Sequence, residues 1–253
     1  MGVVPDVVVV LPCYNEEKRL RLDEIERLGR QSNLRLLFVD DGSSDATAAM
    51  VADFCARGRG RAELLSLPEN RGKAEAVRAG MSQALAGGAA IVGYVDSDLS
   101  TPVDEVLRIL RVMKHTGVAV ALGARVALLG TVIERNPVRH YLGRVFATAA
   151  SLILRLRVYD TQCGAKFFRD TPALRSALAD PFSSRWAFDV ELIGRLLIEG
   201  LATEEFLEVP LQRWADVGGS KLRPVGMVKS GLELVRIAAR LRERRNGRGA
   251  KIT

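Results

Sequence analysis

Continuous apolar runs alternate with helix-like segments over the first half of the chain, and this alternation restricts the folds that the chain can adopt. Runs without polar interruption are typical of strands that are covered on both faces. The strand-like runs are 6–12, 34–41, 62–70, 89–96 and 118–125, and helix-like segments occupy 46–57, 72–88 and 101–117. Strands that alternate with helices predict an α/β fold with a doubly wound, mostly parallel sheet flanked by helices.

The second half of the chain is less regular. Residues 126–187 are expected to mix helix and loop, 202–214 to contain one more strand, and 225–245 to form a basic helix. No internal repeat, low-complexity segment or change of composition marks a second domain.

Acidic residues stand at the ends of two of the expected strands. Asp40 and Asp41 end the second strand, and Asp96 and Asp98 end the fourth with only Ser97 between them. Ligands bind at the carboxyl ends of the strands in such sheets. Two carboxylates so close together repel each other unless a cation lies between them, and Mg²⁺ and Mn²⁺ prefer oxygen ligands. The pair at 96 and 98 therefore predicts a metal site, with a solvated turn as the alternative.

The residues at 40 and 41 leave two interpretations open. The sequence Asp-Asp-Gly-Ser favours a plain turn, because all three residue types are common in turns. A carboxylate at this edge of the sheet could instead accept hydrogen bonds from a nucleobase or a ribose hydroxyl.

The chain is basic, with a formal net charge of +7 and an isoelectric point near 9.7. Such a charge favours an anionic partner, namely nucleic acid, a phosphorylated ligand or an anionic membrane surface. Nucleic acid is not expected as a partner, because no aromatic residues stand between the C-terminal arginines to stack on bases. The chain lacks a Walker A loop and a G-x-G-x-x-G motif after the first strand, which disfavours other nucleotide-binding folds.

The cysteines and the hydropathy of the chain indicate the cellular compartment in which the protein is expected. The three cysteines are widely spaced, fit no zinc or redox motif and indicate reduced thiols in a cytosolic compartment. The first residues do not have the pattern of a signal peptide. No uncharged apolar stretch reaches the roughly 18 residues that cross a bilayer. We therefore expect a cytoplasmic protein whose membrane contact is peripheral, on the cytosolic face.

Four motifs in fixed order carry a resemblance to a known family. "VVLPCYNEE", "FVDDGSSDAT", "ENRGKAEAVRAGM" and "YVDSDLSTP" follow one another between residues 9 and 102. Together they resemble the nucleotide-sugar-binding half of family 2 glycosyltransferases, which have the GT-A fold. The resemblance implies that the acidic pair, Asp96 and Asp98, holds Mg²⁺ or Mn²⁺ on the diphosphate of the donor. It further implies a donor site formed by Pro12, Tyr14, Asn15, Glu16, Asp41, Arg71, Lys73, Asp96 and Ser97.

Three later stretches narrow the resemblance. "VYDTQCGAKFFRD", "RWAFDVELIGR" and "VPLQRWADVGGSKLRP" are similar to the polyprenyl-phosphate (dolichyl-phosphate) glycosyltransferases of family 2, and more to the glucosyl- than to the mannosyl-transferring members. This similarity implies an inverting transfer of a hexose, expected to be glucose from UDP-glucose, to a polyprenyl phosphate. A phosphate acceptor is already ionised and needs cations rather than a base, so positioning and charge neutralisation carry most of the catalysis.

The same similarity suggests residues on the acceptor side. Arg125 and Arg139 are the first candidates for the acceptor phosphate, and further basic candidates are Arg135, Arg144 and Lys166. Asp189 is a candidate general base for a hydroxyl acceptor, with a helix N-terminal carboxylate as the alternative. Ser220 and Lys221 lie in a Gly-rich segment that is expected to close on the diphosphate.

The C-terminal segment completes the expected domain plan, which is a GT-A domain at 1–224 and a basic amphipathic helix and tail at 225–253. One helical stripe contains Val228, Leu232, Val235 and Ala239, and basic residues surround it. Such a helix can lie on an anionic membrane surface, or it can pack on the domain with a solvated basic tail. Two other functions remain open: a related glycosyltransferase with a soluble hydroxyl acceptor, and a non-catalytic nucleotide-sugar-binding or membrane scaffold protein.

Overall fold

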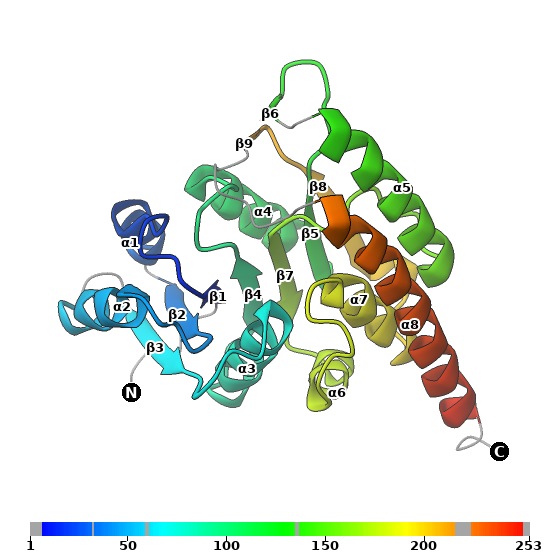
Figure 1. Ribbon diagram of the computed structural model, residues 1–253, viewed down its shortest axis with the longest axis horizontal. Coiled ribbons are helices and arrows are strands. Elements are labelled where there is room, and N and C mark those ends of the chain that lie inside the picture. The colour runs from blue at the N-terminus through cyan, green and yellow to red at the C-terminus, as the bar shows by residue number, and fades with distance from the viewer. Residues whose placement is uncertain (1–6, 32, 59–60, 135–136, 216–223, 250–253) are drawn as a thin grey trace.

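A seven-stranded sheet in the order β3-β2-β1-β4-β7-β5-β8 forms the centre of the protein in a computed structural model (Figure 1). The structure describes residues 7–31, 33–58, 61–134, 137–215 and 224–249. The strands are β1 (Val7–Cys13), β2 (Leu34–Asp40), β3 (Ala62–Ser66), β4 (Ile91–Val95), β5 (Val120–Ala124), β7 (Ala165–Arg169) and β8 (Phe206–Pro210). All pairs are parallel except those of β7, which runs antiparallel to β4 and β5. A separate parallel pair joins β6 (Val132–Glu134) to β9 (Arg213–Ala215).

Helices cover both faces of the large sheet. They are α1 (Leu22–Gly29), α2 (Thr47–Ala56), α3 (Lys73–Ala86), α4 (Val103–Thr116), α5 (Pro137–Leu154), α6 (Pro172–Ala179), α7 (Phe188–Ile198) and α8 (Pro224–Gly249), and a 3₁₀ turn spans Thr203–Glu205. In β1, Val8 and Val10 pack with α3 and α5–α8, whereas Val7, Val9 and Leu11 pack with α1, α2 and α4. Both faces of this strand are buried, which explains its uninterrupted apolar run.

The α/β architecture expected from the sequence is confirmed, including the parallel sheet and the C-terminal helix. The expectation for residues 126–187 was wrong, because this region also contributes β6 and β7. These strands are only three and five residues long, and β7 contains the buried Lys166, so neither has a clear apolar period. β7 is nevertheless central, because it separates β4 from β5 and brings its first residues to the edge where the acidic pair lies.

The face that α8 turns to the protein is not the apolar stripe singled out in the sequence. Leu234, Ile237 and Leu241 are buried in the cluster shared with α5 and α7, whereas Leu232 and Val235 are exposed. The two stripes have the same spacing, so periodicity alone could not tell which one faces inward. Ala239 is exposed as well, and the side chain of Val228 lies outside the described residues. None of the helices in the described part of the chain has the length and hydropathy needed to cross a bilayer.

Candidate active site

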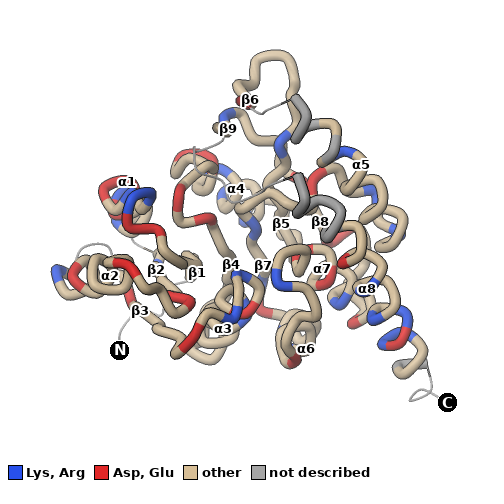
Figure 2. The backbone as a smooth tube through the Cα atoms, in the orientation of Figure 1, with Lys and Arg blue, Asp and Glu red and all other residues tan. Residues whose placement is uncertain are grey.

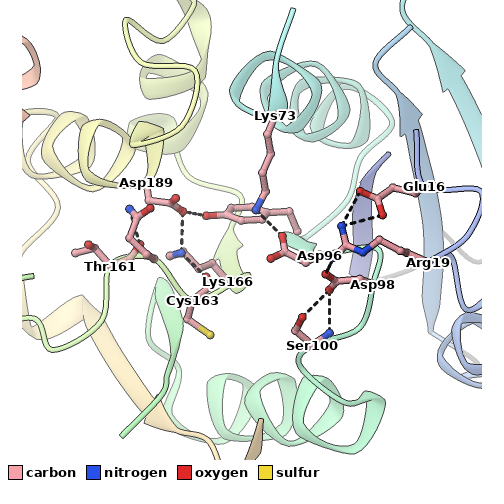
Figure 3. Close-up of polar contacts among 12 residues, drawn as sticks. Glu16, Arg19, Lys73, Asp96, Asp98, Ser100, Thr161, Cys163, Lys166 and Asp189 are labelled. Carbon is pink, nitrogen blue, oxygen red and sulfur yellow. Dashed lines mark hydrogen bonds and ion pairs between the residues drawn. The ribbon is translucent and has the colours of Figure 1, made fainter. Parts of the chain in front are cut away.

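Each member of the acidic pair at the end of β4 has a basic partner from another segment (Figure 3). Lys73, the first residue of α3, donates from Nζ to Asp96 Oδ1 at 2.5 Å. Arg19 donates to Asp98 Oδ2, and the backbone N–H and the hydroxyl of Ser100 donate to Asp98 Oδ1 at 3.0 and 2.8 Å. Burial alone would lower the pKa of Lys73, but Asp96 and Asp189 outweigh it and raise that pKa. The pair is thus charge-compensated by two side chains that can also face phosphate oxygens.

Gly164, just before β7, gives the Asp96 carboxylate its place. The Asp96 N–H donates to the Gly164 carbonyl at 2.9 Å, and a Cβ on Gly164 would lie 2.0 Å from Asp96 Oδ2. Any side chain at position 164 would therefore displace this carboxylate. The glycine of the "DTQCG" stretch thus has a physical role beside the acidic pair.

The carboxylate oxygens at this site are suitable ligands for a hard divalent cation. Asp96 and Asp98 present carboxylate oxygens, and their side chains are 34% and 15% exposed. No group of three or more His, Cys, Asp or Glu side chains in the described residues could by itself hold a metal. Mg²⁺ is commonly bound by one or two carboxylates together with substrate phosphates, so two aspartates fit an ion that a diphosphate completes.

The loop after β1 is tied to the loop after β2. The N–H of Asn15, a residue in the left-handed region with φ 51°, donates to Ser43 Oγ at 3.0 Å, and its side-chain oxygen accepts from the Ser44 N–H at 2.9 Å. The Glu16 N–H donates to Thr47 Oγ1 at 2.8 Å. Pro12, near the end of β1, is half-buried, and Tyr14, on the loop, is 37% exposed. These bonds bring the expected nucleotide-side residues Pro12, Tyr14, Asn15 and Glu16 to the same sheet edge as Asp41.

Asp41 holds the loop between β3 and α3. Its two carboxylate oxygens accept from the backbone N–H groups of Arg71 and Gly72, each at 2.8 Å. Burial raises the pKa of Asp41, and those two N–H groups oppose the effect. Arg185 binds the same loop from its other side by donating to the carbonyls of Asn70 and Arg71, each at 3.0 Å. In the described structure Asp41 thus serves to shape the loop that carries Arg71 and Lys73.

A cluster of buried, hydrogen-bonded side chains lies next to the acidic pair (Figure 3). Lys166 Nζ is 2.7 Å from Asp189 Oδ1 and donates to the Cys163 carbonyl at 2.5 Å, and the Tyr94 hydroxyl also donates to Asp189 Oδ1. Lys166 and Asp189 are almost fully buried. Burial and the charge of Asp189 hold the pKa of Tyr94 well above its ordinary value. Asp189, the candidate base, is therefore already engaged by two donors of the protein.

Arg125 leaves the end of β5 and forms a two-pronged ion pair with Asp160. Nε and Nη2 of Arg125 donate to the two Asp160 oxygens at 2.6 and 2.8 Å. Glu208 holds the same segment by accepting from the N–H groups of Tyr159 and Asp160 at 2.7 and 2.8 Å. Arg144 lies 3.7 Å from the centre of the Tyr159 ring. The expected acceptor-side arginine is thus present at the edge, but a carboxylate already balances its charge.

Of the remaining expected site residues, the structure places Ser97, and four others lie outside its described residues or side chains. Ser97 is buried and hydrogen-bonded to the Cys13 thiol, whose pKa burial raises to about 12. The side chain of Arg139, and all of Ser220 and Lys221, lie outside the described residues, as does Arg135.

Four residues with clear roles at the site were missed in the sequence. They are Arg19, Tyr94, Asp160 and Gly164. The signal for Asp160 and Gly164 was available in the "DTQCG" phrase. Arg19 and Tyr94 meet their partners only through the tertiary structure.

A family model and several known proteins match most of the chain. The family model described as "Glycosyl transferase family 2" matches residues 8–187. A dolichyl-phosphate beta-glucosyltransferase of Trichomonas vaginalis is 33% identical over 243 residues, which cover 90% of this chain and 69% of that protein. The dolichyl-phosphate beta-glucosyltransferase of Homo sapiens is 31% identical over 240 residues, with 85% and 69% covered.

Solved structures resemble the fold. The glucosyl-3-phosphoglycerate synthase from Mycobacterium tuberculosis, in complex with Mn²⁺, UDP and glucosyl-3-phosphoglycerate, superposes with a TM-score of 0.66 at 20% identity. The match covers 93% of this chain and 79% of that one. At this identity the likeness concerns the fold alone.

Proposed function

The chain belongs to glycosyl transferase family 2, and from that premise we propose that it transfers glucose from UDP-glucose to a polyprenyl phosphate. The observation that carries the proposal is the charge-compensated acidic pair at the end of β4, which lies beside Lys73 and Arg19. The relatives that share the sequence over most of the chain are named for transfer of glucose to dolichyl phosphate. Their names supply the sugar and the acceptor in this proposal.

The donor side follows from the acidic pair. Asp96 and Asp98 would hold a Mg²⁺ or Mn²⁺ ion, which would neutralise the charge on the leaving diphosphate. Lys73 and Arg19 lie within reach of the same carboxylates and so are placed to bind phosphate oxygens. The remaining residues proposed for this side are Pro12, Tyr14, Asn15, Glu16, Asp41, Arg71, Ser97, Ser220 and Lys221.

The acceptor side favours a phosphate over a hydroxyl group. A hydroxyl nucleophile needs a base that takes its proton, and Asp189 Oδ1 is engaged by Lys166 and Tyr94. A phosphate monoester attacks without such a base and needs cations to position it. Arg125 and Arg139 remain the proposed cations, with Asp160 orienting Arg125. A lipid-linked acceptor in turn implies work at a membrane surface, which we propose to be its cytosolic face.

The experiment is transfer from UDP-[¹⁴C]glucose to a short-chain polyprenyl phosphate in the presence of Mg²⁺ or Mn²⁺. We expect a charged, chloroform-soluble glucolipid. The Asp96→Asn/Asp98→Asn variant should lose the activity by about 100-fold or more, which is typical when a charge-stabilising group is removed. Asp104→Asn, at a carboxylate that is 77% exposed on α4, is the matched control and should retain it. Lack of product with several sugar nucleotides and both metals would contradict the proposal.

A second candidate is a glycosyltransferase with a soluble acceptor. The fold neighbour from Mycobacterium tuberculosis is described in complex with UDP-glucose and phosphoglyceric acid, which is a soluble molecule. This observation is the reason to test a soluble acceptor. The two candidates separate when phosphoglyceric acid and a polyprenyl phosphate compete in one assay. Transfer to the soluble acid alone would favour the second candidate.

A further inference from the structure

Exposed apolar side chains gather on one region of the surface. Apart from Tyr14, every large apolar side chain that is exposed among the described residues lies in the β5–β6 loop, on β6, on α5 or on α8. They are Leu128 (52% exposed), Leu129 (105%), Val132 (56%), Tyr141 (72%), Val145 (69%), Leu152 (75%), Leu232 (59%) and Val235 (67%). Large contiguous apolar patches on a soluble surface mark interaction sites. We call this set the apolar face.

The two helices turn these side chains away from the core. On α5, Tyr141, Val145 and Leu152 are four and seven residues apart and share one side of the helix, opposite the buried Ala150 and Leu154. On α8, Leu232 and Val235 lie opposite Leu241 in the same way. The helices pack against each other and against α7, and run side by side along one margin of the molecule (Figure 1). The exposed stripes of these two neighbouring helices therefore both face the solvent at this margin of the molecule.

The β5–β6 loop connects this face to the candidate active site. Arg125, which pairs with Asp160 at the sheet edge, is three residues before Leu128. Leu129 then projects fully into solvent, and β6 follows at Val132. The loop rises next to the start of α5 in Figure 1. A surface bound to this face would thus lie beside the acceptor side of the site.

Arginines border the apolar stripe of α8. Arg236 and Arg240 lie on one side of it and Arg242 lies on the other, all exposed, with Glu243 as the acidic residue among them. Blue segments predominate along the C-terminal half of α8 in Figure 2. A helix with this composition binds at the interface of a bilayer that contains anionic lipids. A second copy fits less well, because a two-fold interface would bring the same arginines together.

We propose that the apolar face docks on an anionic lipid bilayer, with Leu128 and Leu129 inserted and the arginines of α8 on the headgroups. The role of this docking rests on the proposed function: a docked face would hold the acceptor side of the site at the bilayer in which a polyprenyl phosphate is anchored. The membrane contact is thereby assigned to the β5–β6 loop and α5 together with α8, rather than to the C-terminal helix alone.

The first test is co-sedimentation of the protein with vesicles of phosphatidylcholine, with and without phosphatidylglycerol. We expect binding to the anionic vesicles and at least a ~10-fold loss of it in the variant Leu129→Ser/Val145→Ser/Leu152→Ser. Arg236→Gln/Arg240→Gln/Arg242→Gln should lose binding mainly at low salt, where charge attraction is strongest. The matched control is Arg57→Gln/Arg61→Gln/Arg111→Gln, which removes three arginines from other surfaces. Equal binding by all variants would overturn the proposal.

The second test locates the contact without requiring a loss of binding. Tryptophan placed by Leu129→Trp should be quenched by brominated lipid in anionic vesicles, whereas tryptophan placed by Ala52→Trp, on the exposed side of α2, should not. Both variants are compared with the unsubstituted chain, because Trp186 and Trp214 contribute a constant signal. Equal quenching at both positions would contradict the assigned face.

Two further outcomes keep this inference separate from the proposed function. If the serine variant turns over a short, water-soluble prenyl phosphate normally and the unsubstituted chain does not bind vesicles, the docking proposal fails and the function stands. If vesicles bind but no acceptor is glucosylated, the function fails and the docking stands. A dimer in light scattering that the serine variant abolishes, without vesicle binding, would show that a second copy covers the face.

Discussion

At the residue scale, the acidic pair behaves as two separate ion pairs. Asp96 has Lys73 and Asp98 has Arg19, and the two bases come from segments far apart in the sequence. A divalent ion at this site would compete with both bases for the same oxygens. Once displaced, they would be left next to the donor diphosphate. Metal and nucleotide binding should therefore be coupled through these two side chains.

Replacing Lys73 tests this coupling. The Lys73–Asp96 pair is about one-third exposed, so it contributes at most about 1 kcal/mol. Lys73→Met should tighten Mn²⁺ binding in the absence of nucleotide by up to ~5-fold. The same variant should weaken UDP-glucose binding. Calorimetric titration measures both constants, with Lys114→Met on α4 as the control. Unchanged Mn²⁺ affinity would mean that Lys73 does not compete with the metal.

The buried Lys166–Asp189 pair leads to a second prediction. Removing one member of a buried pair leaves an uncompensated charge and typically costs about 3–5 kcal/mol. Asp189→Asn and Lys166→Met should each lower the free energy of unfolding by about this much. The double variant Lys166→Met/Asp189→Asn should lose much less than the sum of the two single losses, because it leaves no uncompensated charge. Urea unfolding of the four proteins gives the coupling free energy, and simple additivity would show that the two side chains act independently.

At the scale of the elements, α8 packs into the core through one of its faces. Leu234, Ile237 and Leu241 are buried on it, and a Cβ on Gly194 of α7 would lie 2.4 Å from Leu241 Cδ1. The two helices thus approach closely at a residue without a side chain. The division at 224/225 remains a prediction, but the packing indicates that α8 stabilises the sheet-bearing part.

A matched pair of substitutions on α8 separates its two faces. Leu241→Ala removes a buried side chain and should cost about 2–5 kcal/mol of unfolding free energy. Leu232→Ala changes an exposed side chain on the same helix and should alter stability by about 0.5 kcal/mol or less. Thermal and urea unfolding check both values. Equal losses would mean that the helix is not seated as described.

At the scale of the whole molecule, local patterns determined how much could be predicted. The runs at β1, β2, β4 and β5 are apolar on both faces, so the sheet and the carboxylates at its edge followed from the sequence. β7 did not, because a five-residue strand with a buried lysine has no distinctive period. Arg19–Asp98 and Lys166–Asp189 join residues far apart in the chain, and only the tertiary structure brings them together.

The ion pair between Asp160 and Arg125 should make the stability of the whole fold depend on pH in the acid range. Burial would raise the pKa of this carboxyl, but the Arg125 ion pair outweighs it and holds the pKa well below its ordinary value. An unfolded Asp titrates near ~3.9, so the stabilising effect is complete above that pH and is lost as the pH falls towards the lower folded value.

At pH 7, Asp160→Asn should be less stable than the unsubstituted chain by about 3–5 kcal/mol, because Arg125 is left unpaired. The difference should shrink from pH 5 to pH 3, because the carboxyl at position 160 gains a proton on unfolding there and an asparagine does not. Urea unfolding at several pH values measures it. A difference that stays constant over this range would show that the ion pair does not set the acid stability.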